Sequence, residues 1–156
     1  HLPYPKLALK GLNKIIPKNL NPENKERLTN NFDASITYSR QIGNIYTGSL
    51  YLGLLSLLEQ SQDLKAGDKI GFFSYGSGAV SEIFSGRLVE GYKDLLRSDR
   101  LDIFAKRQHL SVSDYEKLFY EEAQLDDTGS TQFADYQTGA FRLAEISEHQ
   151  RIYKGN

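Results

Sequence analysis

Hydrophobic residues recur at helical spacing in three successive stretches near the start of the chain. The first stretch predicts a helix over residues 5–16, which Pro17 ends. The second predicts an amphipathic helix over residues 22–40 that begins at the capping residue Asn21. The third, residues 46–60, carries leucines on more than one helical face. A helix of this kind is expected in the middle of the molecule.

Strand-forming residues on both sides of a glycine-rich stretch predict a β-hairpin over residues 68–86. The stretch itself is Ser-Tyr-Gly-Ser-Gly, residues 74–78. Gly76 and Gly78 allow a ligand to approach the main chain closely, and Ser77 adds a hydroxyl that donates or accepts a hydrogen bond. An ordinary hairpin with a polar tip has the same spacing. The pattern leaves both interpretations open.

Later in the chain the pattern predicts smaller elements. A helix that begins at Ser111 or Ser113 is expected to cover one side of the domain. Residues 124–138 are polar and are predicted to form a long surface loop. The chain then ends in a hairpin with a polar tip at residues 147–150, where His149 is expected to be solvated. No spacing of His, Asp and Glu is typical of a metal site.

Composition restricts the classes of protein. A chain of 156 residues fits one domain, residues 1–156, and the net charge of −1 gives no reason to expect nucleic acid or an anionic membrane as partner. The longest apolar run, Leu50 to Leu58, is about half of the ~20 residues that a membrane span requires. The absence of cysteine excludes disulfides and cysteine nucleophiles within these residues. Because the sequence contains no methionine, we expect a piece of a longer protein, with His1 either native or left from a tag.

Two groups of polar residues are candidates for ligand binding. Lys6, Lys10 and Lys14 are spaced by four residues and therefore share one helical face, which suits the phosphates of a nucleotide. A solvated face opposite the core is the alternative. Asn44 comes just before the third helix and either caps it or, if Thr47 or Ser49 is the cap, faces a ligand.

Three stretches together carry a resemblance to a known family. They are His-Leu-Pro-Tyr-Pro-Lys at 1–6, Gly-Asn-Ile-Tyr-Thr-Gly-Ser-Leu-Tyr-Leu at 43–52 and Phe-Ser-Tyr-Gly-Ser-Gly-Ala at 73–79. In order and spacing the chain resembles the C-terminal half of 3-hydroxy-3-methylglutaryl-CoA (HMG-CoA) synthase of the bacterial type, in the thiolase superfamily. The resemblance implies an α/β, thiolase-like lobe with a mixed sheet flanked by helices, part of a two-lobe αβαβα enzyme.

The resemblance also implies roles for individual residues. The family condenses acetyl-CoA with acetoacetyl-CoA in the cytoplasmic mevalonate pathway of isoprenoid biosynthesis, using a cysteine, a glutamate and a histidine. His1 matches the family's catalytic histidine, and Asn44 matches an asparagine that hydrogen-bonds the acyl substrate. Ser77 matches the serine of an active-site loop that also contains Tyr75. Such donors stabilise negative charge that develops on a thioester or ketone oxygen.

Partners follow from the same resemblance. Lys6 and Lys10 match positions where the family places basic side chains near CoA, so the expected ligands are CoA thioesters, without a prosthetic group or a metal. The missing N-terminal lobe carries the nucleophile, so this chain alone is predicted to be inactive, and a homodimer is expected. The alternatives are a ketoacyl-synthase-like condensing enzyme and a non-catalytic module for acyl-CoA binding or dimerisation.

Overall fold

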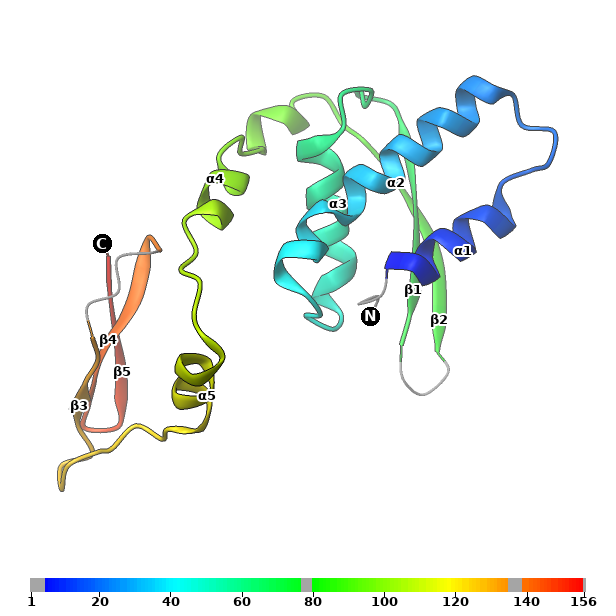
Figure 1. Cartoon of the computed structure of the whole chain (residues 1–156). Helices are drawn as coiled ribbons and strands as arrows, with labels where there is room; N and C mark the ends of the chain where they lie inside the picture. Colours follow the sequence, from blue (N-terminus) through cyan, green and yellow to red (C-terminus); the bar gives the residue numbers. More distant parts are fainter. Residues whose placement is uncertain (1–4, 77–79, 135–138, 156) are drawn as a thin grey trace. The chain divides into compact units, whose positions relative to one another are not determined.

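The chain folds into two compact units, which a computed structural model describes for residues 5–76, 80–134 and 139–155 (Figure 1). The first unit, His1–Ser98, contains α1 (Pro5–Ile15), α2 (Pro22–Ile42), α3 (Gly48–Gln60), β1 (Lys69–Tyr75), β2 (Ser81–Arg87) and the 3₁₀ turn η1 (Tyr92–Leu95). The second unit, Asp99–Asn156, contains α4 (Arg100–Ala105), α5 (Val112–Tyr120), β3 (Thr131–Gln132), β4 (Phe141–Ser147) and β5 (Gln150–Gly155).

The three helices predicted in the first unit are confirmed. Asn21 caps α2 through its side-chain oxygen, which accepts a hydrogen bond from the backbone N–H of Asn24 at 2.8 Å. Pro22 follows at the first helical position, where its missing N–H costs no hydrogen bond. The helix continues two residues beyond the predicted end and stops at Gly43, whose φ of 82° leaves the helical region.

Helices α2 and α3 pack closely because small side chains lie between them. Ser56 is completely buried, and its hydroxyl donates to the carbonyl of Ala34 at 2.6 Å and accepts from the N–H of Tyr38 at 3.2 Å. Tyr38 is 1% exposed, and its hydroxyl donates to Glu59 at 2.6 Å. The buried polar groups of this interface therefore have partners, as burial requires.

The leucines of α3 are less buried than the sequence indicates. α2 covers one side of α3 and β1 touches it, while the leucine side chains remain half-buried and Tyr51 is 58% exposed. The apolar surface of α3 thus exceeds what the described first unit covers. Burial of this helix on all sides is therefore not found within unit 1.

The predicted hairpin is confirmed as β1 paired antiparallel with β2, from Lys69 opposite Arg87 to Tyr75 opposite Ser81. On one face, the rings of Phe72 and Phe84 stack at 4.8 Å. On the other face, Phe73 and Ile83 are paired and are 50% and 79% exposed. A two-stranded hairpin with one apolar face uncovered has little stability of its own.

Unit 2 contains a three-stranded antiparallel sheet in the order β3-β4-β5. β3 lies inside residues 124–138, so the prediction of a loop throughout that stretch was wrong at Thr131–Gln132. Thr131 pairs with Ile146, a contact between distant residues that local composition does not reveal. The predicted combination of helices and strands is confirmed, with the described strands in two antiparallel sheets.

Helix α5 begins as predicted but covers little. Ser111 caps it, accepting from the N–H of Asp114 at 3.1 Å. All residues of Val112–Tyr120 are exposed, so the expected covering of one side of the domain is not found within unit 2. Among the described helices of both units, none combines the length and the apolar character needed to cross a membrane.

The β4–β5 hairpin ends in a turn that contacts the segment before β3. Glu148 and His149 both have positive φ, 47° and 65°. The N–H of His149 donates to the carbonyl of Gly129 at 3.0 Å, and the N–H of Glu148 donates to the hydroxyl of Ser130 at 3.0 Å. The side chain of His149 is exposed, as predicted, although its backbone is fixed by this contact.

Candidate functional site

Four of the predicted site residues are described, and all four belong to unit 1. Asn44 precedes α3, Tyr75 ends β1, and Lys6 and Lys10 lie on α1. The loop before α3 and the ends of β1 and β2 at their connecting turn lie at the same end of unit 1, the lower end in Figure 1. The other two predicted residues, His1 and Ser77, lie outside the described residues.

The side chain of Asn44 is oriented by its own loop. Its Oδ1 accepts a hydrogen bond from the N–H of Tyr46 at 2.8 Å, and the hydroxyl of Ser49 lies 3.5 Å from the same oxygen. The carboxamide oxygen is therefore used within the loop. Asn44 is exposed, and its NH₂ group has no recorded acceptor in the described part of the chain. This group, a double donor, is the part of the side chain that remains for a ligand.

Asn44 does not cap α3, so the first of the two sequence alternatives was wrong. The N-cap position of α3 is Thr47, which makes no side-chain capping hydrogen bond. Instead, Asn44 forms a local turn in which a side-chain oxygen binds the N–H two residues later. The Asn44 side chain is thus held in place before α3 without accepting a hydrogen bond from a backbone N–H of that helix's first turn.

The backbone of this loop is strained. Tyr46 has φ of 52°, a left-handed conformation that an aromatic residue rarely adopts. Gly43 also has positive φ, and a Cβ on Gly48 would approach the side chain of Ile45 to 3.0 Å. The left-handed backbone of a non-glycine residue, here Tyr46, costs on the order of 1–3 kcal/mol, and such residues are concentrated at functional sites. The loop between α2 and α3 is therefore the strongest structural candidate for ligand binding.

Tyr75 lies where β1 ends. It pairs with Ser81, and the next residue, Gly76, donates its N–H to the carbonyl of Val80 at 3.0 Å. The Tyr75 side chain is 48% exposed and is therefore accessible beside the turn that the sequence left open as a ligand loop or an ordinary hairpin tip. That turn includes residues 77–79, which lie outside the described part of the chain. Its two sequence interpretations, a ligand loop and an ordinary hairpin turn, therefore stay predictions.

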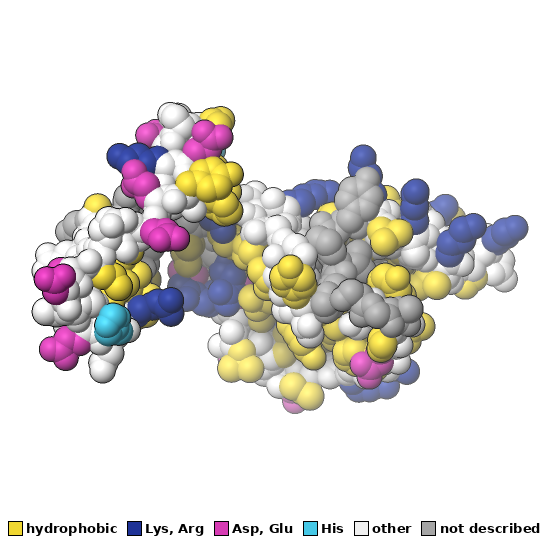
Figure 2. Space-filling view, turned by 90° about the horizontal axis from the view of Figure 1, so that it is seen from below, with side chains coloured by type: hydrophobic (Ala, Val, Ile, Leu, Met, Phe, Trp, Pro, Cys, Tyr) yellow, Lys and Arg dark blue, Asp and Glu magenta, His cyan; other side chains and the backbone are white. Residues whose placement is uncertain are grey.

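The lysine row lies on the outside of α1. Lys6, Lys10 and Lys14 are exposed, while Pro5 and Ala8, on the other side, line a cavity. Figure 2 shows Lys and Arg side chains at the surface of the molecule beside hydrophobic ones. The shared face predicted from the spacing is thus present, and its accessibility is compatible with either a phosphate ligand or solvent.

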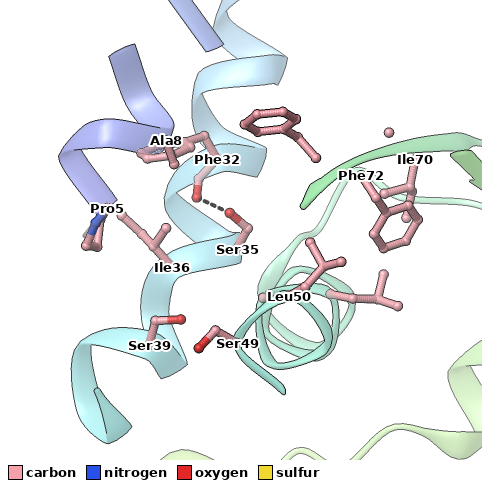
Figure 3. Close-up of a pocket in the computed structure, with 14 residues that line it drawn as sticks. Pro5, Ala8, Phe32, Ser35, Ile36, Ser39, Ser49, Leu50, Ile70 and Phe72 are labelled. Atoms are coloured by element: carbon pink, nitrogen blue, oxygen red, sulfur yellow. Dashed lines mark hydrogen bonds between the residues drawn. The ribbon is translucent and has the colours of Figure 1, made fainter. Parts of the chain in front are cut away.

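The cavity inside unit 1, about 230 Å³ in volume, is surrounded by α1, α2, α3 and β1 (Figure 3). Its walls are mainly apolar, with Phe32, Ile36 and Phe72 among them. The hydroxyl of Ser35 donates to the carbonyl of Phe32 at 2.7 Å, so it is already used by the protein. None of Asn44, Tyr75, Lys6 or Lys10 lines this cavity, and we assign no ligand to it.

Comparison with known proteins relates this arrangement to one family. The model of the hydroxymethylglutaryl-coenzyme A synthase C-terminal domain matches residues 5–154. The chain belongs to the HMG-CoA synthase family. It is 47% identical over 127 residues to the hydroxymethylglutaryl-CoA synthase of Enterococcus faecalis, covering 81% of this chain and 33% of that protein. It is 32% identical over 158 residues to the human mitochondrial enzyme, covering 90% of this chain and 30% of that protein.

Solved structures give the same relationship. A crystal structure of HMG-CoA synthase complexed with CoA matches with a TM-score of 0.83 at 64% identity, over 100% of this chain and 40% of that chain. The HMG synthase of the curacin biosynthetic pathway, in complex with an apo donor acyl carrier protein (ACP), matches with a TM-score of 0.64 at 28% identity, over 89% of this chain and 37% of that one. The thiolase-like fold class is thereby confirmed, and this chain spans about a third of the length of its curated relatives.

Sequence reasoning on this HMG-CoA synthase segment identified Asn44 but not the residue that contacts it. Ser49 was considered as a possible helix cap, whereas its hydroxyl in fact accepts from the N–H of Ile45 at 3.1 Å and lies against Asn44. A serine in the first turn of an otherwise leucine-rich helix was the signal available in the sequence. In the described part of the chain, no group of three or more His, Asp or Glu residues is arranged to hold a metal.

Proposed function

We propose that the protein containing this chain condenses acetyl-CoA with acetoacetyl-CoA to HMG-CoA, and that this chain contributes one side of the acyl-CoA site. The observation that carries the proposal is the orientation of Asn44 in the loop before α3. In this loop the oxygen of Asn44 is bound internally and its NH₂ group remains for a substrate. Membership of the HMG-CoA synthase family supports the reaction.

The chemistry of a condensation suits this geometry. The new carbon–carbon bond forms when a carbanion of the acetyl group attacks the ketone carbon of acetoacetyl-CoA, which places negative charge on the ketone oxygen. A fixed donor at this oxygen lowers the barrier because it does not have to reorient during the reaction. In the proposal Asn44 donates to an oxygen of the acyl substrate, while His1, Ser77 and Tyr75 keep the roles that the resemblance implies. The chain contains no cysteine, so the nucleophile comes from elsewhere in the protein.

The proposed position of the CoA phosphates is beside α1. Lys6 and Lys10 are one helical turn apart and exposed, so their ammonium groups are free to approach two phosphate groups of an extended ligand. The relative at 64% identity was solved in complex with CoA, which supports a CoA thioester as the ligand.

A carrier-protein substrate is the second candidate. One relative, at 34% identity over 85 residues, is the 3-hydroxy-3-methylglutaryl-ACP synthase PksG of Bacillus subtilis, and the curacin HMG synthase was solved with a donor acyl carrier protein. The higher identity to enzymes named for CoA, 47% and 64%, favours the CoA thioester. Comparing free acetyl-CoA with acetyl-ACP as donor distinguishes the two.

The experiment that tests the proposal is an assay of the longer protein, with the part that precedes this chain restored. Acetyl-CoA and acetoacetyl-CoA are supplied, and release of CoA is followed. We expect release that depends on both substrates, and none from the 156-residue chain alone. An inactive longer protein with its cysteine intact would refute the synthase proposal. Turnover by the isolated chain would refute the statement that the nucleophile comes from elsewhere in the protein.

A further inference from the structure

We propose that Ser49 is a positioning residue that holds the Asn44 carboxamide with its NH₂ group toward the substrate. The inference rests on the proposed function, in which Asn44 contacts the acyl group. Ser49 itself is 6% exposed, at the second residue of α3, so it is a poor candidate for direct contact with substrate.

The contacts of Ser49 point back into the loop rather than along the helix. Its hydroxyl accepts from the N–H of Ile45 at 3.1 Å and lies 3.5 Å from Oδ1 of Asn44. A serine that caps a helix accepts instead from N–H groups of the helix's own first turn. The hydroxyl of Ser49 is therefore used to fix the loop that precedes α3.

Ser49 and Asn44 share the task of satisfying two consecutive N–H groups. The N–H of Ile45 binds Ser49, and the N–H of Tyr46 binds Asn44 at 2.8 Å. If the Ser49 hydroxyl is removed, the N–H of Ile45 loses its acceptor, and the Oδ1 of Asn44, which lies 3.5 Å from that hydroxyl, is a side-chain oxygen close to the position it leaves. Competition between the N–H groups of Ile45 and Tyr46 for the Asn44 oxygen would rotate the carboxamide. Its NH₂ group would then no longer point toward the substrate.

The strain in the loop makes such support necessary. Tyr46 has φ of 52° and a side chain that is 68% exposed. A residue kept in an unfavourable region needs surrounding contacts that fix it. The hydrogen bond that Ile45, the residue before Tyr46, donates to the hydroxyl of the buried Ser49 is such a contact.

The test is a double-mutant cycle in the longer protein, using Asn44→Ala, Ser49→Ala and the double variant. Removal of one fixed donor costs roughly 10²–10³ in kcat, and Ser49→Ala misplaces the Asn44 donor without removing it, so we expect kcat/KM for acetoacetyl-CoA to fall about tenfold. If Ser49 acts through Asn44, the double variant should be no worse than Asn44→Ala alone, within about twofold. Ser49→Thr, which keeps a hydroxyl, should restore most of the activity.

Ser35→Ala is the matched control, because Ser35 lines the same cavity as Ser49 but bonds only within α2. It should remain within about twofold of wild type. Wild-type-like activity of Ser49→Ala, or effects that multiply in the double variant, would overturn the inference.

A second measurement does not depend on activity. Hydrogen exchange of the segment 43–48 in the longer protein should become faster in Ser49→Ala and remain unchanged in Ser35→Ala, because Ile45 loses its acceptor. Unchanged exchange in Ser49→Ala would also overturn the inference. An inactive wild type with faster exchange in Ser49→Ala would instead count against the proposed reaction and leave the loop support intact.

Discussion

Gly129 lies beneath the imidazole of His149 in the second unit. It is buried, has φ of 76°, and a Cβ at this position would overlap the His149 ring. Two separate causes therefore oppose any side chain here, namely the left-handed backbone and the lack of space. This residue sets the distance at which the β4–β5 turn packs on the turn that precedes β3.

Gly129→Ala is therefore expected to destabilise unit 2, by roughly 1–3 kcal/mol. Thermal unfolding followed by circular dichroism measures the change. Gly11→Ala is the control, because Gly11 lies in helix α1 with open space around it, and alanine there should be neutral or stabilising. Equal melting temperatures for Gly129→Ala and wild type would contradict the packing described.

Asp126 holds the turn before β3 through its carboxylate. Oδ1 accepts from the hydroxyl of Thr128 at 2.6 Å and from the N–H groups of Ser130 and Thr128 at 2.9 Å each. The Thr128 hydroxyl, followed by the N–H of Ser130, lowers the pKa of Asp126 below its ordinary value. These bonds stabilise the folded chain at neutral pH, and the stabilisation is lost as the pH falls through the lowered pKa.

Removing the Thr128 hydroxyl should raise the pKa of Asp126 toward its ordinary value, because the largest cause of the shift is lost. Thr128→Val makes this change at nearly constant volume. A carboxyl-carbon NMR titration of wild type and variant measures it, with Thr131→Val in β3 as control. An Asp126 pKa that is the same in wild type and Thr128→Val would show that the hydroxyl has no such role.

At the scale of a single element, the exposed lysines of helix α1 are expected to contribute to CoA binding. Reversing the charge at Lys6 or Lys10 should weaken CoA binding about threefold to fivefold each, because a favourable charge contact with phosphate becomes repulsion. The effect should shrink as salt is added. Lys25→Glu, an exposed position on α2, provides the control. Calorimetry with CoA and the longer protein gives the affinities, and equal losses at all three positions would indicate a non-specific charge effect.

The elements that could be predicted from the sequence are those with local causes. The start of α2 follows from Asn21 and Pro22, and the hairpin follows from two strand-forming runs around glycines. β3 could not be predicted, since two residues become a strand only through pairing with β4. The same division applies to the site. The position of Asn44 in its motif was visible, whereas the direction of its NH₂ group depends on the backbone of Tyr46 and on Ser49.

At the scale of the whole molecule, the main feature is the apolar surface that the described first unit leaves exposed. The described first unit exposes Phe73 and Ile83 on one face of the hairpin and leaves the α3 leucines half-buried, and Figure 2 shows hydrophobic side chains reaching the surface. The family match runs through both units, residues 5–154, in a chain about a third as long as its curated relatives. The single domain predicted from length, residues 1–156, stays a prediction.

We expect the 156-residue chain to self-associate at high concentration, because exposed apolar patches of this kind drive association. Light scattering over a concentration series measures the average mass. Ile83→Lys, at a position that is 79% exposed, should shift the series toward the monomer without affecting folding. A monodisperse monomer of the wild-type chain at the highest concentration would contradict the expectation.

The contact of Tyr38 with Glu59 has a consequence for remote positions. This hydrogen bond and the one between Tyr38 and Ser56 hold α2 against α3 at positions that lie outside the connecting loop. The loop with the left-handed Tyr46 therefore joins two helices that these hydrogen bonds hold against each other. Replacing the completely buried Ser56 with a larger residue is expected to push α2 and α3 apart and so to alter the loop that carries Asn44. In the proposed function, a substitution inside this helix pair would thus change how Asn44 meets the substrate without lying in the site itself.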